Sequence, residues 1–482
     1  MNLTTPLFSS NRVSMSYSSL TNFPPLILRN DRRRRGTKKS LRTKIQIPLL
    51  CYARLMVKMA YFSIFPYVAL MVEHDGSSRA TDIGVYVGFF EALFLAAQAL
   101  TSIFWGTMAD RFGGKTILIF SLLGTAISSL IFGFTSSHWQ MALCRCFMGT
   151  VSGGDVVIRA MIGKQCMTET DATCGFSLFS FAGNIGMVSG LIIGHALVNH
   201  VSQYSTILKT VSFLEKYPFC LPGITIGAMS VTCAIVITLF VDDAQQKVNG
   251  VVDDTPSTNS LLPTWAFLCQ LIESRGVGNT PSSFVNISLL GSAFTAVATL
   301  ALYTDISQGG LEFLGHETTL YMICQSAFAA CWLFLIYPAL YRHFGTQNII
   351  SSSPTLFPFL FLSFSIMNAF VRPGSEAGFF IFRVVLGVMT TMRPAVYMVV
   401  TAVYVGLQEV SPSSRKLGLL NGVAEAASCL LRVIVLSIGI LIHAFCNCHS
   451  VTVGYLNWVV LLLIGLSFFV LKCPTWTRLT RS

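Results

Sequence analysis

Long apolar segments alternate with short polar turns along most of the chain. A helix needs about 20 mainly apolar residues to cross a bilayer. Twelve segments reach that length, approximately 47–72, 83–105, 116–136, 138–160, 174–199, 219–241, 284–304, 318–341, 349–371, 377–407, 416–445 and 451–472. They are continuous apolar runs, without the alternation that membrane strands show. The pattern predicts an all-α polytopic membrane protein with twelve transmembrane helices.

Composition agrees with a membrane protein and narrows its class. Of the 482 residues, 53% are hydrophobic and 11% are charged, whereas soluble domains average about 25% charged residues. The chain has no Walker-type phosphate loop and no metal-ligand spacing, so neither an ATP-driven pump nor an enzyme is expected. Cys446 and Cys448 stand close to His449, but this pattern is too weak to predict a metal site. We expect no metal and no resident cofactor.

The excess positive charge lies almost entirely in the first 46 residues. Residues 1–46 hold ten Lys and Arg residues against Asp31 alone, in a chain of net charge +11. We interpret 1–46 as a basic, disordered cytosolic leader that sets orientation by the positive-inside rule. Attraction to anionic lipid and a mitochondrial transit peptide are the alternatives. Nucleic acid is not an expected partner, because no folded domain accompanies the basic run.

The longest polar stretch in mid-chain divides the spans six and six. Residues 242–283 are predicted to be a cytosolic linker between two six-helix bundles, 47–241 and 284–472, with a cytosolic tail at 473–482. With both termini in the cytosol, basic residues concentrate in the inner loops, as the positive-inside rule requires. The plasma membrane is the expected location, and a vacuolar or other internal membrane is the alternative.

Three short matches between the halves indicate an internal duplication. Residues 109–113 match 341–345, residues 145–149 match 383–387, and residues 175–178 match 418–421. The matches keep the same order with slowly drifting offsets. Duplicated six-helix units form transporters in which two bundles rock around a site near the midplane.

A charged, glycine-rich segment at 106–115 separates the second and third spans. Gly106 and Gly113 permit close approach and unusual backbone conformations. Asp110 is expected to accept hydrogen bonds at the start of the following helix, where the helix dipole favours an anion. Arg111 and Lys115 would hold the segment at the cytosolic interface. The segment is interpreted as a gating latch between the halves, or as a determinant of topology alone.

Several charged residues fall inside the first-half spans. Glu91 lies midway along the second span as an isolated carboxylate, which makes it a candidate proton site or a binder of a cationic substrate. Arg145 needs a carboxylate or carbonyl partner if it is buried. Asp155 and Arg159 are four residues apart, so they are expected to pair with each other on one helix face.

Other charged positions extend this candidate set. Arg383 matches Arg145 in the second half. Glu425 and Arg432 are seven residues apart on one face of the eleventh span, where they would point into a cavity or pair across it. Arg54 and Lys58 are expected to extend towards the cytosolic interface.

Gly186, Gly190 and Gly194 form a stripe of small residues in the fifth span. Such stripes let a neighbouring transmembrane helix pack closely. We expect the stripe to serve helix packing.

The segment 106–115 resembles the loop between the second and third helices of major facilitator superfamily transporters. Within that superfamily, the chain is similar to the fungal drug:proton antiporters and the zinc-induced-facilitator-like group. The residues that carry this resemblance are 64–67, 86–88, 105–106, 309–311, 337–338, 344–346 and 417–422 with Arg432.

The resemblance implies proton-coupled efflux of a small organic molecule by alternating access, with the proton gradient as the energy source. It also implies that Arg145 and Gly149, as R-x-x-x-G in the fourth helix, take part in proton coupling; a purely structural pairing of Arg145 with a fixed acceptor is the alternative. Membrane lipid and the substrate are the expected partners of a monomer. Two departures are Val57, where the family carries a carboxylate, and Gly114, where it carries a cation. A transporter-like sensor, an inactive paralogue and a facilitative uptake carrier therefore remain alternatives.

Overall fold

A computed structural model describes residues 27–74, 83–166, 169–203, 217, 219–242, scattered positions from 291 to 313, 315–352, 356–409 and 417–448. The chain divides into two units, residues 1–45 and residues 46–482. The expected linker at 242–283, the tail at 473–482 and the twelfth span lie outside the described residues, apart from Asp242. The seventh span lies outside them except for a few single positions.

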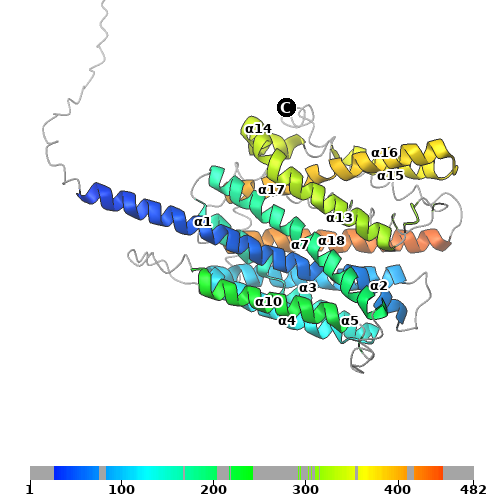
Figure 1. The fold of residues 1–482 in the computed structure, drawn as a ribbon, viewed down its shortest axis with the longest axis horizontal. Coiled ribbons are helices and arrows are strands. Elements are labelled where there is room, and N and C mark those ends of the chain that lie inside the picture. Colours follow the sequence, from blue (N-terminus) through cyan, green and yellow to red (C-terminus); the bar gives the residue numbers. More distant parts are fainter. Residues whose placement is uncertain are drawn as a thin grey trace, which may run out of the picture. The chain divides into compact units, whose positions relative to one another are not determined.

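The described part of the first half is almost entirely helical (Figure 1). Its helices are α1 (Ile27–Phe62), α2 (Phe65–His74), α3 (Ile83–Phe112), α4 (Gly114–Gly133), α5 (His138–Val151), α6 (Gly154–Gln165), α7 (Glu169–Gln203) and α10 (Cys220–Phe240). Together they account for the six spans expected before the linker.

The second half is described in less of its length. Its helices are α13 (Gly315–Cys331), the π-helix η4 (Trp332–Ile336), α14 (Tyr337–Ser352), α15 (Leu356–Val371), α16 (Glu376–Met392), α17 (Pro394–Glu409) and α18 (Leu417–Cys448). Ser375 begins α16 as its N-cap, because its side chain accepts a hydrogen bond from the Gly378 amide.

Eight described helical segments are long and apolar enough to cross a membrane. They correspond to the first six, the eighth and the eleventh of the twelve expected spans. The ninth expected span is the shorter helix α15, and the tenth is divided into α16 and α17. Large side chains such as Leu100, Phe120 and Leu239 are exposed on these helices, as expected where apolar residues face lipid.

The first helix begins earlier than the sequence predicted. The leader at 1–46 was expected to be disordered, but α1 starts at Ile27 and continues without interruption to Phe62. Arg, Lys and Leu are good helix formers, and they fill much of this segment. The charge pattern that suggested disorder is therefore compatible with a helix.

Three of the spans are broken inside the apolar region. The first span breaks between α1 and α2, the fourth at Ser152 and Gly153, and the tenth at Arg393. The break in the fourth span exposes carbonyl groups that neighbouring side chains satisfy. Trp105 Nε1 donates to the Thr150 carbonyl at 2.6 Å, and Ser121 Oγ donates to the Val151 carbonyl at 2.7 Å. Broken helices within a membrane are tolerated where such partners exist, and in transporters they often mark a binding site.

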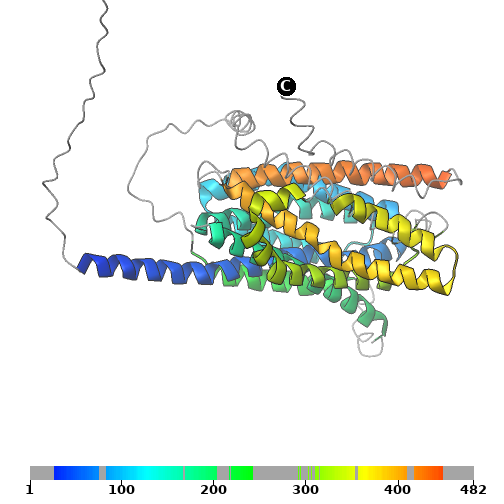
Figure 2. The same ribbon diagram turned by 90° about the horizontal axis from the view of Figure 1, so that it is seen from above.

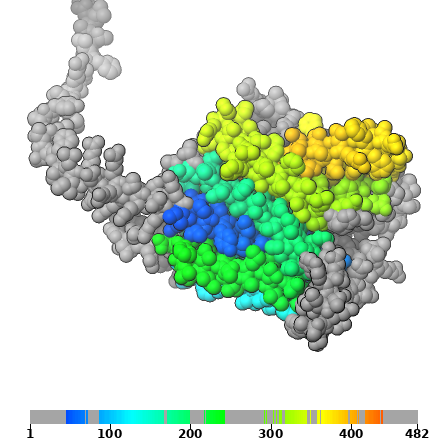
Figure 3. Space-filling model, viewed as in Figure 1, coloured from blue at the N-terminus to red at the C-terminus, as the bar shows by residue number. Residues whose placement is uncertain are grey.

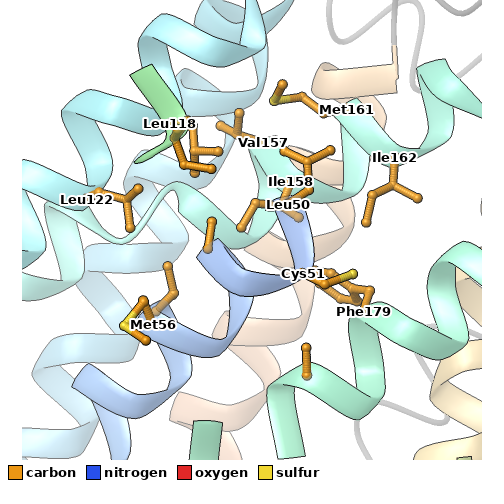
Figure 4. Packing of buried hydrophobic residues seen from close by; sticks show 14 of the residues in the cluster. Leu50, Cys51, Met56, Leu118, Leu122, Val157, Ile158, Met161, Ile162 and Phe179 are labelled. Atoms are coloured by element: carbon orange, nitrogen blue, oxygen red, sulfur yellow. The ribbon is translucent and has the colours of Figure 1, made fainter. Parts of the chain in front are cut away.

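The main apolar core of the first half forms where four helices meet. Leu50 and Met56 of α1 pack with Leu122 of α4, Ile158 of α6 and Phe179 of α7 (Figure 4). On the surface of the molecule, α1 is flanked by α7 and α10 (Figure 3). This packing holds α6 and α1 together and so fixes the charged residues that they carry.

The glycine stripe of α7 packs against α1. A Cβ at Gly190 would meet the Met59 carbonyl at 2.5 Å, and Cβ atoms at Gly186 and Gly194 would collide with the carbonyls of Leu55 and Ser63. Backbones this close exclude any larger side chain.

The two halves also contact each other closely, through α3 and α18 (Figure 2). A Cβ at Gly106 would collide with the Gly418 carbonyl, and a Cβ at Gly422 would lie 2.6 Å from the Ser102 carbonyl. The glycines of both helices therefore permit backbone contact between the halves.

Replacing Gly106 by alanine is expected to force α18 away from α3. Overpacking of this kind costs about 1–3 kcal/mol, so the melting temperature of the purified protein in detergent should fall. Gly387→Ala is the control, because nothing lies within 4 Å of a Cβ at that position. Equal melting temperatures for the two variants would contradict the close contact of α3 with α18.

Candidate functional site

Asp110 lies in the last turn of α3 and joins the two halves. Its carboxylate accepts hydrogen bonds from the Gly418 amide at 3.1 Å and the Leu419 amide at 2.8 Å, both in the first turn of α18. Lys164 Nζ lies 2.8 Å from the same carboxylate. The first amides of a helix lack partners within it, and the helix dipole favours an anion there. Asp110 therefore caps α18 across the interface between the halves.

The sequence placed this cap on the wrong helix. Asp110 was expected to serve the helix that follows it, α4, which begins at Gly114. The segment 106–115 was expected to separate the second and third spans, but α3 continues to Phe112 and only Gly113, with φ 96°, interrupts the helices. Because Asp110 is still helical, its side chain extends sideways to α18, which Gly106 brings into contact. Arg111 is exposed and Lys115 is half-buried.

A second polar contact closes the same end of the bundle. Gln408 Nε2 of α17 donates to the Gly163 carbonyl of α6 at 2.9 Å. Leu417 of α18 lies beside Gly163 as well, since a Cβ added at Gly163 would be 3.4 Å from the Leu417 side chain. Contacts of Asp110, Gly163 and their partners therefore hold the two halves together at this end.

Deeper in the bundle, Asp155 is bound by two cations of α1. Its carboxylate pairs with Arg54 and lies 3.0 Å from Lys58 Nζ. The expected pairing of Asp155 with Arg159 is wrong, since Arg159 Nε contacts only the backbone carbonyl of Asp155, at 3.3 Å. Arg54 and Lys58 do not extend to the interface, because the buried Asp155 carboxylate attracts both. At residue 57 a valine packs in the apolar core, so Asp155 supplies the carboxylate beside Arg54.

Arg159 pairs instead with Glu425 of the second half. Arg159 Nη2 lies 2.6 Å from Glu425 Oε2, and the two side chains are 1% and 8% exposed. The guanidinium also lies 4.8 Å from the centre of the Tyr404 ring. A buried ion pair is stable only while both partners are charged, because a single buried charge is costly. This pair therefore links the halves in a way that depends on the charge of Glu425.

Glu91 is not isolated, as the sequence suggested. Its carboxylate lies 3.1 Å from Arg145 Nη2 and accepts a hydrogen bond from the Tyr61 hydroxyl. Arg145 is 2% exposed, and its guanidinium lies 5.6 Å from the Phe94 ring. The arginine thus has the carboxylate partner that its burial required. The three side chains come from α1, α3 and α5, all in the first half.

The second arginine of the duplicated pattern does not repeat this arrangement. Arg383 is exposed on α16, and a Cβ at Gly387 would meet nothing within 4 Å. At the matching position of the first half, a Cβ at Gly149 would collide with the Phe94 carbonyl. The short sequence match reflects the repeated fold, but it does not place Arg383 in the interior.

Arg432 lies half-buried on α18, two turns beyond Glu425. It interacts electrostatically with Glu425, Tyr61 and Tyr404. Within the part of the chain that the structure describes, no carboxylate forms an ion pair with it. The expected pairing across the bundle is thus made by Glu425, while Arg432 lies on the same helix without an ion pair among the described residues.

Sequence reasoning missed a buried arginine at the break in the tenth span. Arg393 donates a hydrogen bond to Gln325 of α13, and its guanidinium lies 4.8 Å from the centre of the Phe294 ring. The signal was the Arg393–Pro394 step inside an apolar segment, since proline cannot donate a hydrogen bond within a helix. Lys164 and Tyr61 were also missed, because their partners lie on other helices.

The described residues contain no group of three His, Cys, Asp or Glu side chains that would hold a metal ion. His449 and the side chains of Cys446 and Cys448 lie outside the described residues. The ion pairs described above are the chemistry that these residues offer. Neutralising one partner of an ion pair releases the other. Two of the contacts between the halves depend on a carboxylate, that of Asp110 with α18 and that of Glu425 with Arg159.

The chain is similar in sequence to known membrane transporters. The family model of the Major Facilitator Superfamily matches residues 50–435. The efflux pump azaK of Aspergillus niger is 31% identical over 389 residues, which cover 81% of this chain and 79% of that protein. The protein ZINC INDUCED FACILITATOR 1 of Arabidopsis thaliana is 26% identical over 53% of this chain and 56% of its own length.

Two solved transporter structures have a similar fold. The crystal structure of the human organic anion transporter MFSD10 matches with a TM-score of 0.67 at 12% identity, covering 89% of this chain and 99% of that one. The proton:xylose symporter XylE matches with a TM-score of 0.62 at 14% identity, covering 89% and 94%. From the matched residues, the paired helices and these relatives, the chain belongs to the major facilitator superfamily and is a membrane transporter.

Proposed function

We propose that the protein exports a small organic molecule in exchange for protons, by alternating access between its two halves. The observation that carries the proposal is the Arg159–Glu425 pair, buried between the halves at 2.6 Å. Protonation of Glu425 would end its attraction to Arg159, and the interface would then lose a buried contact. A carboxylate in this position couples proton binding to separation of the halves.

The relatives support the direction of transport. One relative is an efflux pump, and the multidrug transporter mfsB of Aspergillus fumigatus is 29% identical over 206 residues. From these relatives we infer only the class of transport, which is the outward movement of a small organic compound. The energy source in this proposal is the proton gradient, with no resident cofactor. We propose a monomer in the plasma membrane whose termini lie in the cytosol.

The alternative that the protein is a sensor or an inactive paralogue rested on Val57 and Gly114. Asp155 supplies a carboxylate to Arg54 from the neighbouring helix, which offsets the absence of one at residue 57. Gly114 lies against Met161. A Cβ added at Gly114 would be 2.5 Å from the Met161 side chain, so a lysine would not fit there without a shift. The departure at Val57 therefore has a structural compensation, and the departure at Gly114 has a packing reason.

The proposal is tested with purified protein reconstituted into proteoliposomes that carry an imposed pH gradient. A panel of labelled neutral, cationic and anionic compounds is loaded, and the loss of each is followed with and without a protonophore. We expect at least one compound to move against its concentration gradient in a protonophore-sensitive way. Flux that ignores the pH gradient would instead indicate a facilitative carrier, and absence of flux across the panel would contradict transport.

Glu91 is the second carboxylate that we propose takes up a proton during transport. Glu91→Gln is expected to reduce gradient-driven flux by about 100-fold, because an amide cannot carry a proton in this way. Tyr61→Phe is the matched variant, since it removes the hydrogen bond from the Tyr61 hydroxyl but keeps the carboxylate and its ion pair with Arg145. Tyr61→Phe should therefore retain most of the flux. Equal losses in the two variants would show that Glu91 acts only through its local packing.

A further inference from the structure

The centre of the bundle carries more positive than negative charge. Four cations, Arg54, Lys58, Arg159 and Arg432, surround the two carboxylates of Asp155 and Glu425. Both carboxylates are already engaged, Glu425 by Arg159 and Asp155 jointly by Arg54 and Lys58. With these groups ionised, the cluster has two positive charges in excess. Uncompensated charge is costly in a membrane interior, and it marks a place where a counter-charge binds.

The excess charge is divided between the two halves. Lys58 belongs to α1 of the first half and Arg432 to α18 of the second, and the two interact electrostatically across the interface. Like charges that face each other across an interface repel. An anion placed between Lys58 and Arg432 would replace this repulsion with two attractions, one to each half.

The surroundings of the two cations suit an organic ligand. The Lys58 side chain is 23% exposed and Arg432 is half-buried, so neither is sealed inside the protein. Tyr61 lies 5.6 Å from the Lys58 ammonium, and Tyr404 packs on Arg159. Ligand sites in proteins combine such aromatic walls with a few polar groups that fix orientation.

Unused hydrogen-bond donors lie in the same cluster. Arg159 Nη1 is buried and has no hydrogen-bond partner among the described residues, although Arg159 is only 1% exposed. Arg54 Nε is a second such donor, on a residue that is 9% exposed. Buried donors are normally satisfied, and a guanidinium forms its strongest hydrogen bonds with anionic oxygen.

We propose that the transported substrate is an organic anion with an aromatic or apolar body, whose charged group binds between Lys58 and Arg432. This inference rests on the proposed transport function and adds the substrate class. Because the two cations come from different halves, the bound anion draws the halves together at this level. Substrate occupancy and the arrangement of the halves are thereby coupled through the same two side chains.

The inference is tested by ligand binding to the purified full-length protein in detergent micelles. The probes are two matched pairs, benzoate with benzamide and 2-naphthoate with 2-naphthamide, which differ in charge and little in shape. We expect the native protein to bind each carboxylate at least about tenfold more tightly than its amide. Equal affinity within both pairs, or preference for the amides, would overturn the inference.

Variants locate the site. Lys58→Gln and Arg432→Gln should each remove the preference for the carboxylates, and Arg432→Lys should retain most of it. Arg383→Gln is the control, since it removes one positive charge from an exposed position of α16. Unchanged preference in both Lys58→Gln and Arg432→Gln, with melting temperatures close to native, would also overturn the inference. If Arg432→Gln fails to fold, Lys58→Gln alone decides, because the site needs both cations.

Binding and transport separate the two proposals. Protonophore-sensitive flux of neutral or cationic compounds, without selective carboxylate binding, would leave proton-driven transport standing and overturn the anion site. Selective carboxylate binding without gradient-driven flux of any compound would support the anion site and overturn the proposed transport function.

Discussion

Replacing Glu425 by leucine is expected to destabilise the protein by about 3–5 kcal/mol, because Arg159 is then left buried without its counter-charge. Arg159 is 1% exposed, so water cannot reach it to offset the loss. Transport should be lost as well, since the charge-dependent link between the halves is gone. The free energy of unfolding, measured by denaturant titration in detergent micelles, gives the size of the effect.

A double-variant cycle separates stability from function. Replacing a buried ion pair by apolar residues of similar volume is often neutral. Arg159→Met combined with Glu425→Leu should therefore recover most of the lost stability, while gradient-driven transport stays absent. If the losses in unfolding free energy of the two single variants simply add in the double variant, a direct pairing of Arg159 with Glu425 is contradicted.

Replacing Asp110 by alanine is expected to open the end of the bundle where α3 meets α18. The substitution removes hydrogen bonds to the Gly418 and Leu419 amides and the ion pair with Lys164. Hydrogen bonds to a charged group each contribute about 1.5–3 kcal/mol. A net loss of about 3 kcal/mol would shift the ratio of closed to open protein by roughly 100-fold.

Amide hydrogen exchange measures this opening directly. The peptide that covers the first turn of α18 should exchange faster in Asp110→Ala, while peptides within α4 should be unchanged. Arg111→Ala is the matched control, because Arg111 is the next residue and is exposed. Similar exchange in the two variants would mean that the carboxylate of Asp110 does not hold α18.

The fold was largely predictable from the sequence because apolar length is a local property. Each apolar run of about 20 residues predicts a span without knowledge of its neighbours. The breaks in the spans were harder to predict, since Ser152 and Gly153 interrupt a helix only where Trp105 and Ser121 satisfy the freed carbonyls. The leader was misjudged for a related reason, since its charge pattern does not exclude the helix that begins at Ile27.

Several members of the candidate site were predicted from the sequence, but their partners were not. Glu91, Arg145, Asp155 and Glu425 stand out as charged residues in apolar segments, and the structure buries or half-buries all of them. Their partners depend on which helices lie side by side, which no local pattern contains. For that reason the spacing of four residues predicted a pair between Asp155 and Arg159. In the structure Asp155 pairs with α1, and Arg159 pairs with α18.

In the mechanism that we propose, protonation drives the two halves apart at the end of the bundle that holds Asp110. The most direct test is the distance between spin labels at Arg111 on α3 and Arg342 on α14, two exposed positions on different halves. The labels are attached through unnatural amino acids, so the native cysteines remain in place. We expect a short distance at neutral pH, a second and longer population in acid, and a mainly long distance in Asp110→Ala at either pH. A single distance that changes neither with pH nor with Asp110→Ala, in protein that still transports, would contradict the account.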